Sequence, residues 1–167
     1  TPLDHKIELL ERAGIDAVVV VRTTHAFLAI SAEQFIREVI LARFHPIAMV
    51  EGPTFGFGAR RRGNVQTLTD AGQEHGFAVE VVEPVRVALG GHPETIVSSS
   101  LIRHLLGSGT VDGAALCLGR PYALIGRVQQ GAGRGRTLGF PTANLSIASQ
   151  MVPAEGVYAG RAVIEHA

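Results

Sequence analysis

The start of the chain has two hydrophobic patterns in succession. Thr1 and Pro2 have the order of an N-cap and a first-turn proline, and the apolar residues that follow recur at helical spacing up to Gly14. Residues 17–21 are a continuous run of one alanine and four valines, a pattern typical of a strand buried on both faces of a parallel sheet. The chain is therefore predicted to open with a helix and then a strand. The apolar face of the helix comprises Leu3, Ile7, Leu10 and Ala13.

The same order of helix and strand occurs twice more. Residues 31–34 (Ser-Ala-Glu-Gln) have the spacing of a capping box, and residues 47–50 are the strand expected after that helix. Asn64 is the expected N-cap of a third helix, which stops near Gly76 before a strand over residues 77–82. This alternation predicts an α/β fold with an open, doubly wound parallel sheet. The two helices carry apolar faces of Phe35, Ile36, Val39, Ile40 and Phe44, and of Val65, Leu68 and Ala71.

The pattern changes after residue 118. Gly-Arg-Pro at residues 119–121 interrupts the chain, and residues 122–128 and 157–164 are predicted strands with a glycine-rich loop between them. No helical period of useful length follows this point. We therefore predict an α/β domain over residues 1–118 and part of an all-β domain over residues 119–167.

Composition narrows the function classes. With 46% hydrophobic and 18% charged residues the chain can bury an ordinary core, and no apolar run approaches the ~20 residues of a membrane-spanning helix. Cys117 is the only cysteine, which excludes an internal disulfide and fits a cytoplasmic protein. The formal net charge is zero, so nothing global indicates a nucleic-acid or membrane partner. Between Asp112 and Glu155, however, the charged side chains are all arginines, an arrangement that attracts anions.

The most specific candidate for chemistry is the glycine-rich stretch at residues 131–144. Its glycines, Gly133 among them, allow a ligand to approach the backbone N–H groups, while Arg134 and Arg136 offer fork-shaped donors to phosphate oxygens. Thr142 and Asn144 supply neutral oxygens that can hold Mg²⁺ bound to nucleotide phosphates. The alternative is a flexible hairpin turn with a solvated basic rim. Glycine spacing alone does not decide between them.

A second candidate is the segment of residues 97–103 (VSSSLIR). Ser98, Ser99 and Ser100 precede a short apolar helix and can present hydroxyl and N–H groups at its positive end, which is a ready anion site. Arg103 lies one turn inside and can reach the same phosphate. The alternative is a serine-capped surface helix with an arginine on its solvated face. Its place after the last strand of the α/β pattern favours a ligand site.

A third candidate is the loop of residues 51–63 (EGPTFGFGARRRG). Phe55 and Phe57 can stack on a planar ring, and Arg61, within a run of three arginines, can meet its phosphate. A mobile basic loop with weak affinity for any polyanion is the alternative. Spacing does not separate the two.

Taken together, these motifs resemble the bacterial bifunctional riboflavin kinase and FMN adenylyltransferase family, also called FAD synthetases. Residues 135–145 (GRTLGFPTANL) are similar to the riboflavin kinase signature, and residues 97–103 resemble the adenylyltransferase I-S-S-T-x-I-R motif. Residues 55–63 are similar to the family's D-F-x-F-G and arginine-glycine loop, although Thr54 stands where an acid or amide is usual. The resemblance covers nearly the whole chain.

The resemblance implies a nucleotidyltransferase domain followed by the first part of a riboflavin kinase β-barrel. It implies that residues 98–100 and Arg103 bind ATP, that Thr142 and Asn144 bind Mg-ATP with Gly133 and Arg136, and that the loop of residues 51–63 binds the flavin. Substrates would be ATP, riboflavin and FMN, with Mg²⁺ as cofactor. The family's H-x-G-H segment and its kinase glutamate have no counterpart here, so we expect a chain truncated at both ends, with little kinase activity and no assignable catalytic residue.

Two other function classes stay open at this point. One is a non-catalytic nucleotide- or flavin-binding module, for which the missing segments would be the natural state. The other is an RNA-binding protein that uses residues 60–62 and 134–136, which would bind with a steep dependence on salt. Zero net charge and the lack of a recognisable RNA-binding motif count against the second.

Overall fold

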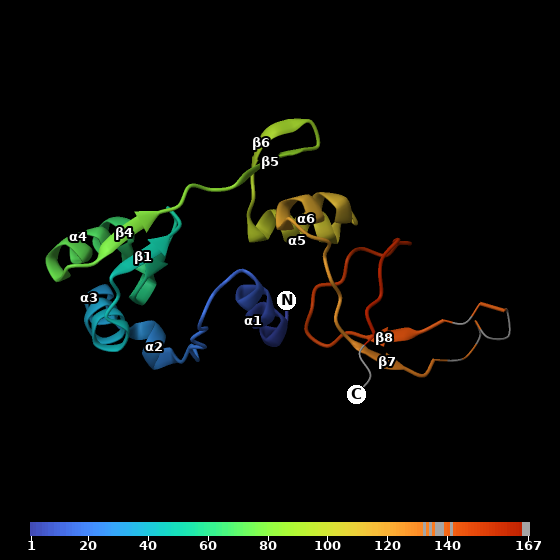
Figure 1. Ribbon diagram of the computed structural model, residues 1–167, viewed down its shortest axis with the longest axis horizontal. Coiled ribbons are helices and arrows are strands. Elements are labelled where there is room, and N and C mark those ends of the chain that lie inside the picture. The colour runs from blue at the N-terminus through green and yellow to red at the C-terminus, as the bar shows by residue number, and fades with distance from the viewer. Residues whose placement is uncertain (132, 134, 136–138, 141, 165–167) are drawn as a thin grey trace. The chain divides into compact units, whose positions relative to one another are not determined.

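The structure is a computed structural model that describes residues 1–131, 133, 135, 139–140 and 142–164 (Figure 1). Its contacts divide the chain into two compact units. The first is formed by Val19–Val85, and the second combines Thr1–Val18 with Arg86–Ala167. Each unit is described by itself below.

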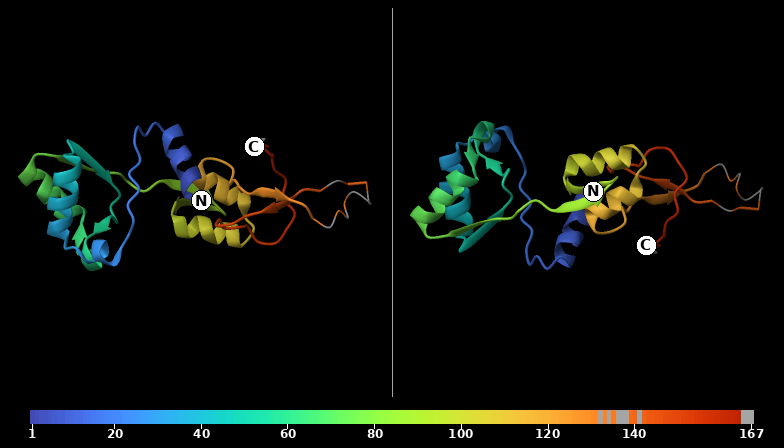
Figure 2. Two further views of the ribbon diagram at one scale, coloured as in Figure 1. Left: turned by 90° about the horizontal axis from the view of Figure 1, so that it is seen from below. Right: turned by 90° about the horizontal axis from the view of Figure 1, so that it is seen from above.

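The Val19–Val85 unit is built around a parallel pair of strands. Strand β1 (Ala48–Glu51) pairs with β4 (Ala78–Val81), with Ala48 opposite Ala78 and Glu51 opposite Val81. Helix α4 (Val65–His75) connects the strands and packs against β4 (Figure 2). This is one strand–helix–strand unit of the kind that parallel sheets require.

Shorter elements complete this unit. Helices α2 (His25–Ala29) and α3 (Ala32–Gln34) lead into η1 (Phe35–Phe44), and η2 (Ala59–Arg61) lies within the loop after β1. Strands β2 (Gly56–Phe57) and β3 (Gly63–Asn64) form a small antiparallel pair around η2.

Local side-chain hydrogen bonds begin the helices where the sequence predicts. The Ser31 hydroxyl accepts from the Gln34 N–H at 3.1 Å, and the Gln34 side chain accepts from the Ser31 N–H at 2.9 Å, which completes the predicted capping box. Asn64 caps α4 in the same way through the Thr67 N–H at 3.0 Å. Gly76 ends α4 with a φ of 81°, which glycine adopts without strain.

The predicted helix that contains Phe35 to Phe44 forms, but mostly with π-type hydrogen bonding. Its last bond runs from the His45 N–H to the Ile40 carbonyl at 3.1 Å, five residues back. Ile36 and Ile40 face the core, whereas Phe44 is exposed. The predicted apolar face is therefore buried only in part.

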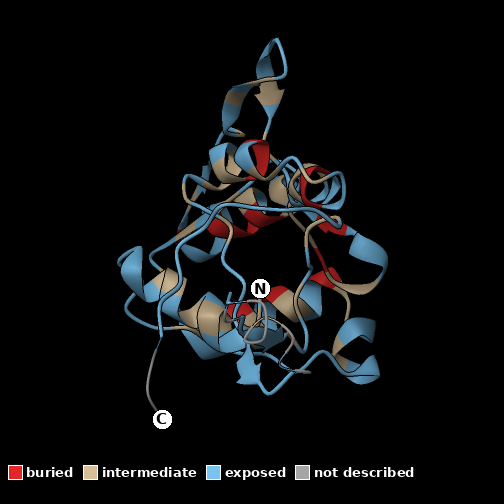
Figure 3. Cartoon of the chain, turned by 90° about the vertical axis from the view of Figure 1, so that its right-hand side faces the viewer, coloured by how far each residue is buried: buried red, intermediate tan, exposed pale blue. Residues whose placement is uncertain are grey.

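One apolar cluster forms the core of the Val19–Val85 unit (Figure 3). Leu68 of α4 is fully buried, and Phe57 is 6% exposed. By area, burying each large apolar side chain contributes about 1.5–3 kcal/mol. The buried members of the cluster are Ala32, Ile36, Ile40, Phe57, Leu68, Ala71 and Phe77.

The second unit contains two helices, two antiparallel strand pairs and the N-terminal helix among its described elements. Helix α1 is Leu3–Arg12, strands β5 (Arg86–Leu89) and β6 (His92–Ile96) form a hairpin, and helices α5 (Ser99–Gly107) and α6 (Val111–Leu118) follow. Strand β7 (Arg127–Gln129) pairs with β8 (Asn144–Ser146). The core consists of Leu105, Leu106 and Ala114, where α5 packs against α6.

Two predicted strands are wrong. Residues 17–21 belong to no described helix or strand, and Val19, Val20 and Val21 are exposed. Residues 157–164 also form no strand, and of residues 122–128 only the last two enter β7. A strand needs a neighbour to bond with, and apolar, β-branched sequence alone does not supply one.

The predicted start of α1 is also wrong by one residue. Pro2, rather than Thr1, occupies the N-cap position, and no side chain caps the helix. The Pro2 carbonyl accepts from the Lys6 N–H at 3.0 Å, so the first turn closes on the proline itself.

The α/β class with a parallel strand pair is confirmed. Within the described residues, no helix is long and apolar enough to cross a membrane.

Candidate functional site

The serine-rich segment caps a helix as predicted. Ser98 is the N-cap of α5, and its hydroxyl accepts from the Leu101 N–H at 3.2 Å. Ser99 and Ser100 form the exposed first turn, and Arg103 is exposed one turn further on. The first N–H groups of a helix lack partners within the helix. Because Ser99 and Ser100 are also exposed, a phosphate can reach both the N–H groups and the two hydroxyls at this end of α5.

This site is an open surface rather than an enclosed cavity. Two shallow cavities of the described residues, of about 490 and 530 Å³, lie elsewhere, within the Val19–Val85 unit. None of Ser98, Ser99, Ser100 and Arg103 lines either of them. A ligand at this site would therefore be bound by the exposed N-terminal end of α5.

Phe55 and Phe57 stack on each other in the loop after β1. Their ring centroids are 5.5 Å apart with an interplanar angle of 28°, and the Phe57 ring also contacts Phe35 at 5.3 Å. Phe57 is buried, while Phe55 is half-buried. Of the two predicted aromatic residues, only Phe55 therefore offers a ring face to a ligand.

Arg61 is held in the same loop by the backbone. Its Nη2 donates to the Thr54 carbonyl at 2.8 Å, and the guanidinium lies against Gly56, where an added Cβ would be 3.0 Å from it. Thr54 thus contributes a main-chain oxygen that any residue provides. The contact cannot be predicted from the identity of residue 54, because the acceptor is a main-chain oxygen.

The glycine-rich stretch places small residues beside both predicted magnesium ligands. A Cβ added to Gly135 would lie 2.9 Å from Thr142 Oγ1, and one added to Gly131 would lie 2.8 Å from Asn144 Cγ. Asn144 opens β8 opposite Gln129, and both Thr142 and Asn144 are exposed.

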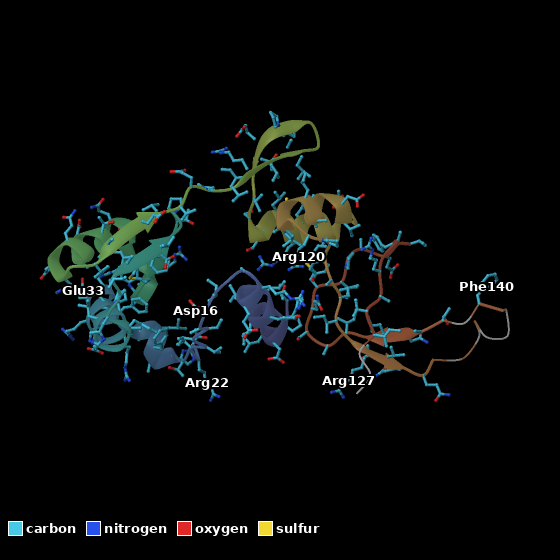
Figure 4. All side chains as sticks on the ribbon, viewed as in Figure 1. Asp16, Arg22, Glu33, Arg120, Arg127 and Phe140 are labelled. Carbon is cyan, nitrogen blue, oxygen red and sulfur yellow. The ribbon has the colours of Figure 1, made fainter. Side chains whose placement is uncertain are left out.

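The rest of the stretch is described only in part. Gly133 is exposed with a φ of 69°, whereas Arg136 lies outside the described residues. Phe140 is 77% exposed, and its side chain points away from the β7–β8 connection (Figure 4).

The predicted magnesium ligands are neutral oxygen donors. Within the described residues, no group of three or more His, Cys, Asp or Glu can hold a metal ion. Thr142 and Asn144 offer neutral hard oxygens of the kind that Mg²⁺ takes as ligands, and both side chains are exposed. These residues therefore fit Mg²⁺ shared with a nucleotide.

Two carboxyl groups of the Val19–Val85 unit have shifted pKa values. Burial at the end of β1 raises the pKa of Glu51, where the aromatic loop begins. A hydrogen bond from Ser31, aided by the backbone N–H of Glu33 itself, lowers the pKa of Glu33. The raised pKa of Glu51 reflects the cost of ionising a partly buried carboxyl group.

Two family models match consecutive parts of the chain. The model described as FAD synthetase matches residues 1–100, and the model described as riboflavin kinase matches residues 118–167. Since the first match alone covers more than half of the sequence, the chain belongs to the FAD synthetase family.

Curated relatives carry both activities in their names. The bifunctional riboflavin kinase/FMN adenylyltransferase of Escherichia coli K12 is 36% identical over 159 residues, which is 95% of this chain and 49% of the relative. The protein of the same name from Bacillus subtilis 168 is 35% identical over 165 residues, 98% of this chain and 50% of the relative. The chain thus spans about half the length of the curated relatives it matches.

A solved structure also shares this backbone. It is described as a macrolide-efflux protein from Streptococcus pneumoniae, with a TM-score of 0.81 and 28% identity. The alignment covers 93% of this chain and 48% of that protein.

Proposed function

We propose that the protein acts in FAD biosynthesis, phosphorylating riboflavin to FMN and adenylylating FMN to FAD with Mg-ATP. The observation that carries this proposal is the succession of the two family matches along one chain, with the serine-capped helix α5 at the end of the first and the glycine-rich stretch inside the second. The curated relatives named for both reactions support it.

In the adenylylation, a phosphate oxygen of FMN attacks the α-phosphorus of ATP, and pyrophosphate leaves. The exposed N–H groups and hydroxyls at the start of α5, with Arg103 one turn inside, would hold the ATP phosphates and offset their charge. Phe55 would stack on the flavin, with Phe57 beneath it as a rigid support and Arg61 towards the FMN phosphate. Such transfers depend mainly on positioning and charge neutralisation.

In the kinase reaction, a ribityl hydroxyl oxygen attacks the γ-phosphorus of ATP, ADP leaves, and the hydroxyl proton passes to a base. Thr142 and Asn144 would hold Mg²⁺, which when bound neutralises charge on the phosphate oxygens. Gly133 would leave its N–H open to the nucleotide, and Arg136 would donate to a phosphate.

The finer architecture is part of the same proposal. The β1–α4–β4 unit would belong to a doubly wound sheet in a nucleotidyltransferase domain over residues 1–118. The β7–β8 pair would be the first ladder of a riboflavin kinase barrel over residues 119–167. The parallel pair β1–β4 lies in the first part, together with the antiparallel pairs β2–β3 and β5–β6, and the described strands of the second part form the antiparallel pair β7–β8.

Product analysis tests the proposal. The purified protein is incubated with Mg-ATP and either riboflavin or FMN, the products are separated by chromatography, and binding of each substrate is measured by calorimetry. Formation of FMN from riboflavin and of FAD from FMN is expected only at low rates, because the family's H-x-G-H segment and kinase glutamate have no counterpart in this sequence. Binding of ATP and flavin without either product would instead favour a non-catalytic binding module, and absence of both binding and products would overturn the assignment.

A further inference from the structure

A segment near the end of the chain is fastened to the C-terminal end of helix α5. The Ala154 N–H donates to the Leu106 carbonyl at 2.9 Å, in the last turn of the helix. A Cβ added to Gly109, just after α5, would lie 3.0 Å from Tyr158 Oη and 3.7 Å from Ala154 Cβ. The Leu106 carbonyl also accepts from the Gly109 N–H at 3.0 Å, so the Ala154 N–H is a second donor to the same helix end.

Side-chain hydrogen bonds hold this segment in place. Gln150 bridges to the strand-like stretch before β7, accepting from the Ile125 N–H at 3.0 Å and donating to the Ala123 carbonyl. The Tyr122 hydroxyl donates to the Met151 carbonyl at 2.8 Å, while the Tyr122 ring packs against the α5–α6 core. We name residues 150–158, fixed by these contacts, the α5 clasp.

The clasp contacts the end of α5 at Leu106 and Gly109, which lie between the two stretches that the family models match. The clasp lies within the riboflavin kinase match at residues 118–167, and the first turn of α5 lies at the end of the FAD synthetase match at residues 1–100. Leu106 is 2% exposed, so its end of α5 is packed, whereas the serine end is exposed. Helix α5 has only nine residues, and hydrogen bonds join its successive turns between the Leu106 end and the serine end.

We propose that Gln150 and Tyr122 are positioning residues for the phosphate end of α5: by holding the clasp on Leu106, they fix the orientation of Ser98–Arg103 from the opposite end of the helix. The expected effect on ATP binding rests on the proposed function. Any such coupling is reciprocal, so occupancy of the α5 site also tightens the clasp.

Hydrogen exchange tests the positioning without any ligand. In the full chain, Gln150→Ala removes both bridging bonds, and Tyr122→Phe removes only the hydroxyl bond. We expect amide exchange to become about tenfold faster in Gln150→Ala, both at Ala154 and in the first turn of α5, with a smaller change in Tyr122→Phe. Ser149→Ala, an exposed neighbour, is the control and should leave exchange unchanged. Unchanged exchange at Ser99–Leu101 in Gln150→Ala would overturn the inference.

A binding comparison then tests the functional consequence. Calorimetry should show Mg-ATP affinity at α5 lowered about three- to tenfold in Gln150→Ala and less in Tyr122→Phe, with the binding enthalpy and stoichiometry retained. Faster exchange in α5 together with unchanged ATP affinity would overturn the positioning role. If the unmodified chain binds no Mg-ATP, the proposed function is wrong. The hydrogen-exchange result then decides by itself whether the clasp stabilises the first turn of α5.

Discussion

Phe55 and Phe57 stack 5.5 Å apart, yet only the Phe57 ring is buried in the core. The pair therefore joins a ring that stabilises the fold to a ring that is half-exposed at the loop surface. The two residues look equivalent in the sequence, but in the structure Phe57 packs in the core and Phe55 lies partly exposed.

Substitution of the two phenylalanines should separate stability from ligand binding. Phe57→Ala should lower the free energy of unfolding by about 3–5 kcal/mol, because it empties a site in the core. Phe55→Ala should destabilise much less but weaken FMN binding by about 0.5–1.5 kcal/mol, the value of an aromatic stack. Denaturant unfolding and flavin fluorescence titration measure the two effects. Equal losses of stability in both variants would contradict this division.

Arg103 should contribute to ATP binding and little to folding. Arg103→Ala should weaken Mg-ATP affinity by about 1.5–3 kcal/mol, as expected for a charged hydrogen bond, because Arg103 is exposed one turn from the serine end of α5. His104→Ala is the matched control, being exposed on the same helix. An affinity for Mg-ATP that is the same in both variants, measured by calorimetry, would remove Arg103 from the site.

Gly63 should be intolerant of any side chain. An added Cβ would lie 2.6 Å from Cε2 of the buried Phe57 ring, so Gly63→Ala should cost about 1–3 kcal/mol of stability through overpacking. Gly52→Ala, where an added Cβ meets nothing within 4 Å, is the control and should change stability by less than about 0.5 kcal/mol. Thermal unfolding compares them, and a harmless Gly63→Ala would show that the Phe57 ring can move aside.

Glu51 should make folding less favourable as the pH rises. Burial raises its pKa in the folded state, so its contribution to stability is full below the ordinary value of 4.5 and is lost as pH rises through the folded pKa. Glu51→Gln should therefore be more stable than the unmodified chain at neutral pH, with the advantage vanishing in acid.

Glu33 should affect the pH dependence of stability in the opposite direction and therefore serves as a control. The pKa of Glu33 is lowered in the folded state, so its contribution is present above the ordinary value of 4.5 and is lost as pH falls through the folded pKa. Glu33→Gln should thus be less stable than the unmodified chain at neutral pH. Urea unfolding over a pH series checks both variants, and the same direction of change in the two would contradict the account.

The sequence predicted the features that depend on local hydrogen bonds. Ser31, Asn64 and Ser98 cap helices as expected, because a cap joins a side chain to backbone only a few residues away. Helix α6 and the β5–β6 hairpin were not predicted, although Gly90 and Gly91, both with positive φ, are a hairpin signal in the sequence.

Features that depend on distant partners were predicted less well. The valine run at residues 17–21 has the composition of a buried strand, but it finds no strand partner among the described residues. The burial of Phe57 depends on Phe35 and Leu68, which come from other elements. Likewise, the Arg61 contact with the Thr54 carbonyl has no signature in residue type.

The central claim is that the serine end of α5 binds the phosphates of ATP, and an NMR titration tests it most directly. The amide resonances of the ¹⁵N-labelled chain are followed as Mg-ATP is added. We predict saturable shifts concentrated at Ser98–Leu101 and Arg103, and their loss in Arg103→Ala. Unmoved α5 amides at millimolar Mg-ATP, or shifts confined to other elements, would contradict the claim.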